Sequence, residues 1–201
     1  MKLYFSPGAC SLADHIALLE AGLDFELERV DLKTKTTASG ADFTTINGKG
    51  YVPVLVLDDG EKVTENLAVL DWIATRNPAL GLEGQMGRTR LLETLAYIST
   101  ELHKSFKPFY ASTNEEEKAK AQALLVRRLQ WIADRVRGPY LFGERPTVAD
   151  FYLFVMLRWA VKFGVPLPEA LVGLHGRLLA LPSVDSALAR EESPPRQSAA
   201  A

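Results

Sequence analysis

The first 78 residues alternate between short apolar runs and segments in which apolar side chains recur every three or four positions. Apolar runs bounded by Gly, Pro, Asp or Ser indicate strands, and the three-to-four spacing indicates amphipathic helices. The expected elements are a strand at 2–5, a helix at about 12–22, a strand at 25–30, an irregular or short helical stretch at 33–45, strands at 52–57 and 62–64 around a turn at 58–60, and a helix at 67–74. This order predicts a small α/β unit.

Beyond residue 78 the pattern changes to helical spacing alone. A glycine-containing stretch at 79–87 indicates a linker, and Thr147 to Asp150 fit a capping box ahead of an apolar run. The expected helices lie at 88–110, 115–136, 151–161, 171–181 and 184–189, with a flexible tail from about residue 191. We therefore predict an α/β plus all-α fold, with a domain at 1–78, a linker at 79–87 and an all-helical domain at 88–201.

Composition narrows the classes of partner. The chain has 201 residues, is 47% hydrophobic, and carries 23 Lys and Arg against 25 Asp and Glu, for a net charge of -2. This balance does not favour nucleic acid or an anionic membrane surface as a partner. No apolar stretch approaches the roughly 18 residues of a membrane span, and the N-terminal apolar run is too short for a signal peptide. We expect a cytoplasmic protein.

Cys10 is the only cysteine, and it lies between a Ser-Pro-Gly turn and the first expected helix. Unpaired backbone N–H groups at a helix start favour a thiolate, whereas the carboxylate of Asp14 opposes it. Ser11 is expected to cap the helix, with Asp14 completing a capping box. With no second cysteine, disulfide chemistry needs an external thiol such as glutathione. The alternative is that Cys10 is a small apolar side chain packed under the turn.

Two further features suit a peptide-like ligand. Pro53 at the start of an apolar strand permits a cis peptide bond after Val52 and an exposed backbone edge, although it also fits an ordinary strand-entry proline. Asn66 is placed to cap the following helix, whose free N–H groups suit a carboxylate, and Glu65 is placed to receive an ammonium group. A plain helix cap explains the same pair without a ligand.

Four segments, in their order and spacing, carry a resemblance to a known family. They are MKLYFSPGACSLADHIALLE, NGKGYVPVLVLDDG, TELHKSF and FGERPTVADFYLF. From residue 2 to about residue 189 the chain resembles the beta class of glutathione S-transferases, which are bacterial two-domain enzymes. The resemblance implies a thioredoxin-like N-terminal domain, a helical-bundle C-terminal domain, glutathione as substrate with no other cofactor, and a homodimer.

The resemblance also implies roles around the reacting sulfur. Cys10 lies beside the glutathione sulfur and forms a mixed disulfide with it, and Ser11 is its neighbour at the helix start. His103 resembles the family histidine that reaches the thiol region. Without the resemblance, His103 fits a helix-surface histidine with one hydrogen bond.

Glutathione carries two carboxylates and one ammonium group, so it needs both basic and acidic partners. The resemblance places Lys35 and Lys104 near the glycyl carboxylate, and the backbone of Val52, before a cis Pro53, against the cysteinyl unit. It implies that Glu65 and Asn66 bind the γ-glutamyl end. It also implies that Glu101 reaches across a dimer interface to the glutathione bound by the partner subunit.

We also expect a pocket for a small hydrophobic electrophile. The candidates are apolar or aromatic and lie near Cys10 or on the expected helices: Ala9, Phe106, Phe109, Tyr110, Trp159 and Phe163. Aromatic side chains at helical spacing are also typical of a core.

Four positions depart from the family pattern, and the first is Phe5, where the family often has an aromatic hydroxyl that this chain carries instead at Tyr4. Tyr51 stands where glutamine is usual, Asn66 stands where serine or glycine is more common, and Ala96 stands where many relatives have an asparagine. We expect one polar contact to the thiol region to be missing at Ala96. His15, His103 and His175 lack partners at ligand spacing, so His15 and His175 are expected to be structural and no metal site is predicted.

The predicted function is a glutathione S-transferase that conjugates glutathione to small electrophiles or exchanges it with disulfides through Cys10, with thiol-transferase or peroxidase side activity. Two alternatives stay open. One is a transferase-like binding or docking protein without turnover, and the other is a monothiol redox sensor that only becomes glutathionylated. Turnover with an aromatic halide or a glutathione mixed disulfide separates an enzyme from both.

Overall fold

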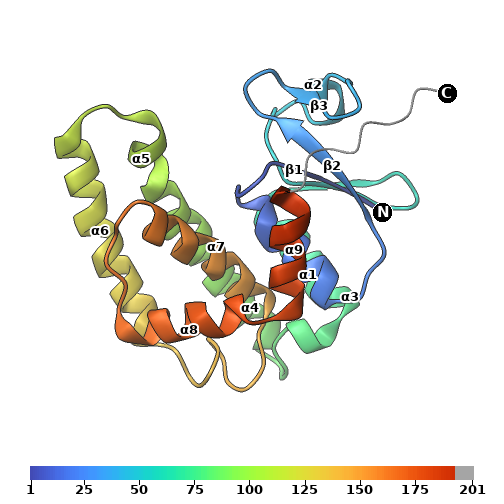
Figure 1. The fold of residues 1–201 in the computed structure, drawn as a ribbon. Helices are drawn as coiled ribbons and strands as arrows, with labels where there is room; N and C mark the ends of the chain where they lie inside the picture. Colours follow the sequence, from blue (N-terminus) through green and yellow to red (C-terminus); the bar gives the residue numbers. More distant parts are fainter. Residues whose placement is uncertain (193–201) are drawn as a thin grey trace.

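The computed structural model describes residues 1–192, and its first part is built on a five-stranded sheet (Figure 1). The strands are β1 (Lys2–Phe5), β2 (Glu26–Asp31), β3 (Thr36–Thr37), β4 (Val54–Val56) and β5 (Lys62–Thr64). Their order in the sheet is β3-β2-β1-β4-β5, with β1 parallel to β2 and the other neighbours antiparallel. The four expected strands are confirmed, and the two-residue β3 is an addition within the stretch expected to be irregular.

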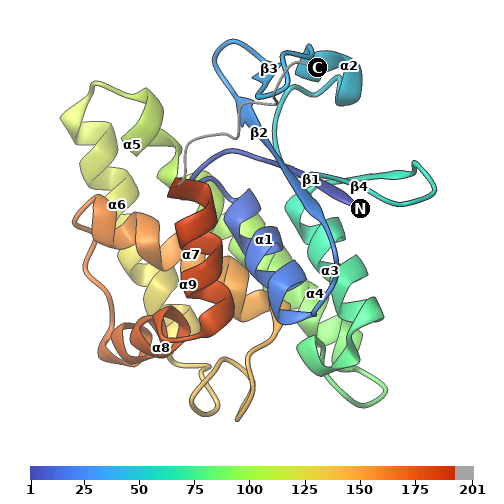
Figure 2. The ribbon, with the colours of Figure 1, turned by 45° about the vertical axis from the view of Figure 1, so that its right-hand side comes forward.

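Helices cover both faces of this sheet. Leu3 and Phe5 of β1 are buried, and they share the main core with α1 (Ser11–Glu20) and α3 (Asn66–Arg76), which lie beside the sheet in Figure 2. On the other face, Phe43 of the one-turn helix α2 (Phe43–Ile46) packs with Val30 and Val54. Successive side chains of β1 point to opposite faces of the sheet, and a separate apolar cluster lies on each face.

The second part of the chain is entirely helical. After the short 3₁₀ turn η1 (Pro78–Leu80), the elements are α4 (Gly87–Tyr97), η2 (Ile98–Leu102), η3 (His103–Phe106), α5 (Lys107–Ala111), α6 (Glu115–Ala133), α7 (Val148–Lys162), α8 (Glu169–Leu179) and α9 (Pro182–Glu192). The expected α/β plus all-α fold class is confirmed. The domain boundaries remain a prediction, since one apolar core runs through both parts.

The helix expected at 88–110 is wrong as a single helix. α4 ends at Tyr97, a π-helical turn follows over Ile98–Leu102, and a 3₁₀ turn leads into α5. The carbonyl of Glu101 accepts hydrogen bonds from the Ser105 hydroxyl and the Arg128 guanidinium, both at 2.7 Å. These side-chain hydrogen bonds compensate for the backbone hydrogen bonds of the helix that are interrupted here. Turns of π-helix are frequent at functional sites.

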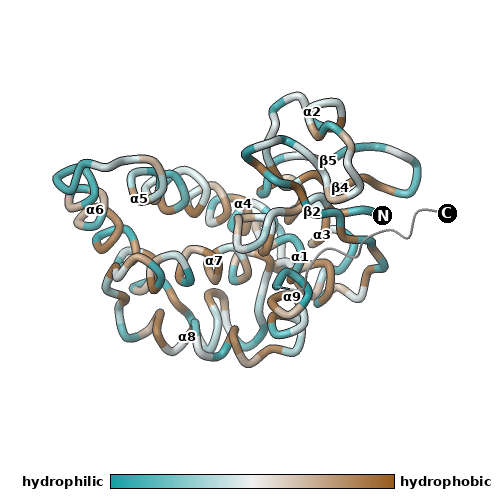
Figure 3. The backbone as a smooth tube through the Cα atoms, turned by 45° about the horizontal axis from the view of Figure 1, so that its top comes forward, coloured by the Kyte–Doolittle hydropathy of each residue, from teal (hydrophilic) through white to brown (hydrophobic). Residues whose placement is uncertain are grey.

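α7 is the central helix of the second part and lies between α4 and α8 (Figure 3). The expected capping box is confirmed: the Asp150 carboxylate accepts from the N–H and the hydroxyl of Thr147 and from the N–H of Leu141, each at 2.8 Å. Most of the helix is buried because its side chains are apolar on nearly all sides. One end of α7 is thereby fixed within the core.

The C-terminal helix extends further than expected. α9 continues through Glu192, and Glu191 is buried, so the tail does not begin at residue 191. The remaining tail residues, 193–201, lie outside the described part of the chain. Within residues 1–192, no helix has both the length and the apolar character needed to cross a membrane.

Candidate functional site

Cys10 stands at the start of α1, directly after the turn formed by residues 6–9. It is the N-terminal boundary residue of the helix, with helical φ and ψ and no side-chain capping bond. Its sulfur lies 3.7 Å from the carbonyl oxygen of Val52. The expectation that Ser11 caps the helix is wrong, because Ser11 lies inside α1 and its hydroxyl turns back to accept a 3.3 Å hydrogen bond from the N–H of Ser6.

Distant elements hold the turn before Cys10 in place. The N–H of Gly8 donates to Glu191 of α9 at 2.8 Å, and the indole N–H of Trp159 donates to the carbonyl of Gly8 at 2.9 Å. The second oxygen of Glu191 lies 3.2 Å from Nδ1 of the buried His15. His15 is therefore structural, as expected, and the position of Cys10 depends on both parts of the chain.

Burial keeps the thiol of Cys10 protonated. Burial, followed by the nearby Asp14, raises the pKa of Cys10 to about 12, although N–H groups at the helix start act in the opposite direction. Of the two opposing effects expected from the sequence, Asp14 and the helix start, neither is the largest: desolvation outweighs the helix terminus. At neutral pH the group is a neutral thiol, which donates to the Val52 carbonyl.

Asp14 and Asn66 join α1 to α3 below the thiol. Asp14 is fully buried, and burial raises its pKa well above the usual range. The Asn66 amide, oriented to satisfy its neighbours, donates to Asp14 at 2.7 Å and to the carbonyl of Cys10 at 3.0 Å. The expectation that Asn66 caps α3 is wrong, because Glu65 occupies the N-terminal boundary position and the Asn66 side chain turns toward α1.

The backbone at Val52 presents an open edge to the site. The Val52–Pro53 peptide bond is cis, as the resemblance implied. The carbonyl of Val52 accepts from Cys10, while its N–H has no partner among the described residues. A peptide-like ligand can therefore pair with this residue.

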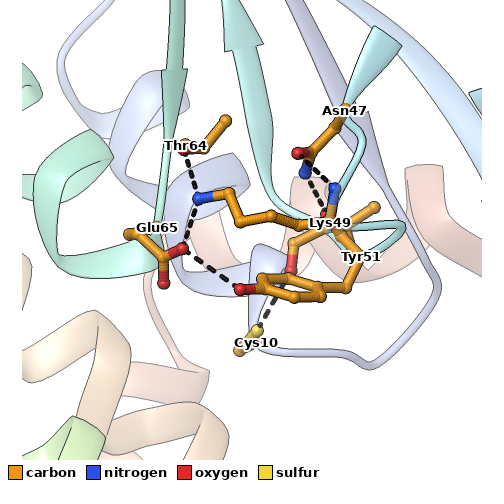
Figure 4. Close-up of polar contacts among 7 residues, drawn as sticks. Cys10, Asn47, Lys49, Tyr51, Thr64 and Glu65 are labelled. Carbon is orange, nitrogen blue, oxygen red and sulfur yellow. Dashed lines mark hydrogen bonds and ion pairs between the residues drawn. The ribbon is translucent and has the colours of Figure 1, made fainter. Parts of the chain in front are cut away.

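Glu65 lies at the rim of the site and already accepts a cation (Figure 4). Its carboxylate contacts the Lys49 ammonium at 2.5 Å and the Tyr51 hydroxyl at 3.3 Å, and Lys49 also donates to Thr64 at 2.8 Å. Glu65 has a positive φ of 71°. This backbone conformation, which is uncommon for residues other than glycine, turns the start of α3 toward Cys10.

His103 forms the opposite wall of the site with two residues of α7. Its Nδ1 lies 2.7 Å from the Tyr152 hydroxyl, and its ring packs edge-on against Trp159 with centroids 5.0 Å apart. Burial and the charge of Lys104 lower the pKa of His103 to about 4, and burial raises the pKa of Tyr152. Both groups are neutral, and we assign Tyr152 as the donor and Nδ1 as the acceptor, which places the imidazole proton on Nε2.

These groups line one cavity of about 1000 Å³. Of the residues expected from the sequence, it brings together Ala9, Cys10, Val52, Pro53, Glu65, Asn66, His103, Lys104, Tyr110 and Trp159. Phe106, Phe109 and Phe163 do not line it. Phe106 is fully buried in the core, and Phe109 and Phe163 stack on each other with centroids 5.1 Å apart.

Lys35 and Glu101 also lie outside the cavity wall. The Lys35 ammonium donates to the carbonyl of Gly50 at 2.7 Å. The Glu101 carboxylate forms an ion pair with Arg128 of the same chain, which also bonds Ser105. Each side chain therefore already has one partner within the chain.

Sequence reasoning missed several cavity residues. They are Ser6, Pro7, Gly8, Leu32, Leu67, Ser99, Tyr152, Arg158, Val161, Lys162, His175 and Leu179, and Tyr51 was noted only as a departure. Ser99 hydrogen-bonds Tyr152 and thus supplies a polar contact near the position where one was expected to be missing at Ala96. Tyr152 and Trp159 are seven positions apart, two helical turns on one face, and that spacing was the available signal. His175, which was expected to be structural, lines the cavity.

Among residues 1–192, no cluster of three or more His, Cys, Asp or Glu is placed to hold a metal ion.

Comparison with known protein families agrees with this arrangement. Residues 9–76 match the family model described as glutathione S-transferase, N-terminal domain, and residues 115–184 match glutathione S-transferase, C-terminal domain. The chain is 41% identical to glutathione S-transferase GstA of Escherichia coli O157:H7 over 95% of this chain and 98% of that protein.

Solved structures give the same result. A sphingomonad glutathione S-transferase complexed with glutathione superposes with a TM-score of 0.88 at 43% identity, covering 95% of this chain and 98% of that one. The beta-class glutathione S-transferase of Sphingomonas chungbukensis superposes with a TM-score of 0.87 at 40% identity, covering 96% and 99%. The resemblance to the beta class is confirmed, and the comparisons give no support to a non-catalytic binding protein.

Proposed function

The chain belongs to the glutathione S-transferase family, and on this premise we propose that it binds glutathione in the cavity beside Cys10 and transfers it to small electrophiles. The observation that carries the proposal is the meeting of three groups in one cavity: the Cys10 thiol, the free N–H of Val52 and the His103 imidazole. A cysteinyl peptide that pairs with Val52 brings its sulfur between Cys10 and His103.

Charged groups around the cavity suit the two ends of glutathione. Glu65 is exposed enough to accept the γ-glutamyl ammonium, and its contact with Lys49 already has the geometry of an ammonium–carboxylate pair. Lys104 lines the cavity without a carboxylate partner in the described part of the chain, so it is free for the glycyl carboxylate. Charge-assisted hydrogen bonds of this kind position a ligand as well as bind it.

Both groups at the thiol position can donate to a glutathione thiolate, Cys10 once its S–H turns away from the Val52 carbonyl. Cys10 is a neutral thiol, and neutral His103 carries its proton on Nε2. Two donors in a partly desolvated cavity stabilise a glutathione thiolate more than water does. The thiolate then forms a bond to the electrophilic carbon while the leaving group departs with its electron pair, and proximity supplies the remaining advantage.

We further propose that Cys10 exchanges with glutathione disulfides. Cys10 loses its proton and attacks one sulfur of the disulfide, a Cys10–glutathione disulfide forms, and the departing glutathione thiolate takes up a proton. A second glutathione reverses the step. Because the pKa of Cys10 is about 12, we expect this exchange to be slow compared with conjugation.

Two parts of the proposal rest on resemblance alone. We propose a cytoplasmic homodimer in which Glu101, paired with Arg128 of its own chain, contacts the glutathione of the partner. Light scattering of the purified protein tests the dimer. A monomeric, fully active enzyme would exclude a role for Glu101 across an interface.

The function is tested with two substrates on the same samples. We expect the wild-type protein to conjugate glutathione to 1-chloro-2,4-dinitrobenzene and to exchange with cysteine–glutathione disulfide. Cys10→Ser should retain conjugation and lose exchange, together with the Cys10 adduct of about 305 Da in the intact mass. A folded wild-type protein without either activity would contradict the proposal.

A further inference from the structure

The cavity continues beyond the thiol region to two cationic side chains at the end of α7. Past Trp159 its wall includes Arg158 and Lys162, together with His175 and Leu179 of α8. We infer that Arg158 and Lys162 form an anion-binding subsite, and that the electrophiles this enzyme prefers carry a carboxylate or a similar oxyanion. This inference rests on the proposed function and specifies its substrate class.

The charges of the cavity wall are unbalanced. Glu65 is the only carboxylate among the described residues that line the cavity, and it is paired with Lys49 at the opposite rim. Arg158 and Lys162 form no ion pair or hydrogen bond with a carboxylate anywhere in residues 1–192. His175 adds no charge at neutral pH, because burial and the charge of Arg158 lower its pKa. An uncompensated pair of cations in a partly enclosed cavity attracts an anionic ligand.

The two cations contact aromatic rings in this wall, Tyr110, and behind it, Phe154 and Phe163. The Lys162 ammonium lies 5.3 Å from the centroids of Tyr110 and Phe163. The Arg158 guanidinium lies 5.8 Å from the ring of Phe154, on which His175 also stacks. Such contacts fix the direction of each cation and leave its N–H donors available to an oxyanion.

A chain of ring contacts joins this subsite to the thiol region. His103 packs on Trp159 with centroids 5.0 Å apart, Trp159 packs on Tyr110 at 5.4 Å, and Lys162 lies over Tyr110. An electrophile that occupies this wall meets the glutathione sulfur at its reactive end and the two cations at its other end. The wall therefore suits an aromatic or unsaturated acid better than a neutral hydrocarbon.

A matched pair of aryl chlorides tests the inference. In 4-chloro-3-nitrobenzoate and 4-chloro-3-nitrobenzamide the same reaction occurs: the glutathione sulfur bonds to the ring carbon and chloride leaves with the electron pair. After division by the uncatalysed rates, we expect wild-type kcat/KM to favour the benzoate by about tenfold, the lower end of the value of one charge-assisted hydrogen bond. Rising ionic strength should reduce this preference.

Three variants assign the effect to residues. Arg158→Gln and Lys162→Gln should each lower the ratio of benzoate to benzamide kcat/KM several-fold and leave the KM for glutathione unchanged. Arg127→Gln removes an equal charge from the exposed face of α6, outside the cavity, and should leave the ratio unchanged. An equal ratio in all four proteins, or a loss that appears only as a raised KM for glutathione, would overturn the inference.

Failure of the proposed function can be separated from failure of this inference. The unreactive 4-methyl-3-nitrobenzoate and its amide bind without chemistry, and calorimetry compares their affinities directly. If neither chloride is conjugated and 1-chloro-2,4-dinitrobenzene and cysteine–glutathione disulfide are not turned over either, the proposed function fails. The anion subsite then stands if the acid binds several-fold more tightly than the amide in an Arg158-dependent way, and it falls if the two bind equally.

Discussion

The high pKa of Cys10 predicts slow reaction of this thiol with disulfides in the absence of glutathione. With a pKa of about 12, about one molecule in ten thousand carries a thiolate at pH 8, compared with about one in four for an ordinary thiol of pKa near 8.5. The more basic thiolate is also more nucleophilic, and a Brønsted slope of about 0.45 recovers a factor of about 40. We therefore expect Cys10 to react about 60-fold more slowly than a free cysteine peptide.

The assay is exchange with 2,2′-dithiodipyridine, followed by the absorbance of the released thiopyridone from pH 6 to pH 10. The predicted rate rises tenfold for each pH unit without reaching a plateau, because the titration midpoint lies above this range. Steric protection alone would slow the reaction but leave a plateau near pH 9. Asp14→Asn, which removes the second cause of the shift, should raise the rate at each pH.

Any plateau between pH 6 and pH 10 would refute the reasoning. A plateau near or below pH 8.5 would mean that the N–H groups at the start of α1 outweigh the burial of Cys10. Cys10→Ser supplies the baseline, since the chain has no other cysteine.

Three further predictions concern groups around the site. Tyr152→Phe removes the donor to His103 Nδ1 and should lower kcat for conjugation about fivefold, the value of one hydrogen bond. The KM for glutathione should change little. An unchanged kcat would contradict the assigned tautomer. Folding raises the pKa of Asp14, so the free energy of unfolding of the wild type falls as pH rises above about 4. In urea titrations, the free energy of unfolding of Asp14→Asn should fall less than that of the wild type between pH 5 and pH 8. Parallel pH profiles of the two proteins would exclude this. Glu191→Ala removes the acceptor of the Gly8 N–H and the partner of His15, and should lower the free energy of unfolding by about 1–3 kcal/mol. It should also weaken glutathione binding. An unchanged affinity for glutathione would show that the turn before Cys10 does not need α9.

The order of elements was predictable because burial leaves a period in the sequence. Alternation in β1 and three-to-four spacing in α1 and α3 reflect which side of each element packs on the core. The capping box of α7 was equally visible, because its bonds join Thr147 to Asp150, three residues away. The π turn at Ile98–Leu102 was not visible, since its compensation comes from Arg128 on another helix.

The reactivity of the site was harder to predict than its location. Position at a helix start was predicted correctly for Cys10, but the sign of its pKa shift depends on how α3, α7 and the backbone of Val52 enclose it. Asn66 was read as a cap because a cap is a local feature, whereas its partner Asp14 lies on another helix. Arg158 and His175 have no local signal, because only the packing of α7 on α8 brings them to the cavity wall.

The central claim is that the cavity beside Cys10 binds glutathione and lowers the pKa of the glutathione thiol. The most direct test is an ultraviolet difference titration with glutathione near neutral pH, with S-methylglutathione as the reference ligand that cannot ionise. We predict a saturable thiolate absorbance that S-methylglutathione does not produce and that His103→Ala strongly reduces. Saturable binding of glutathione without thiolate absorbance, or no binding at all, would contradict the claim.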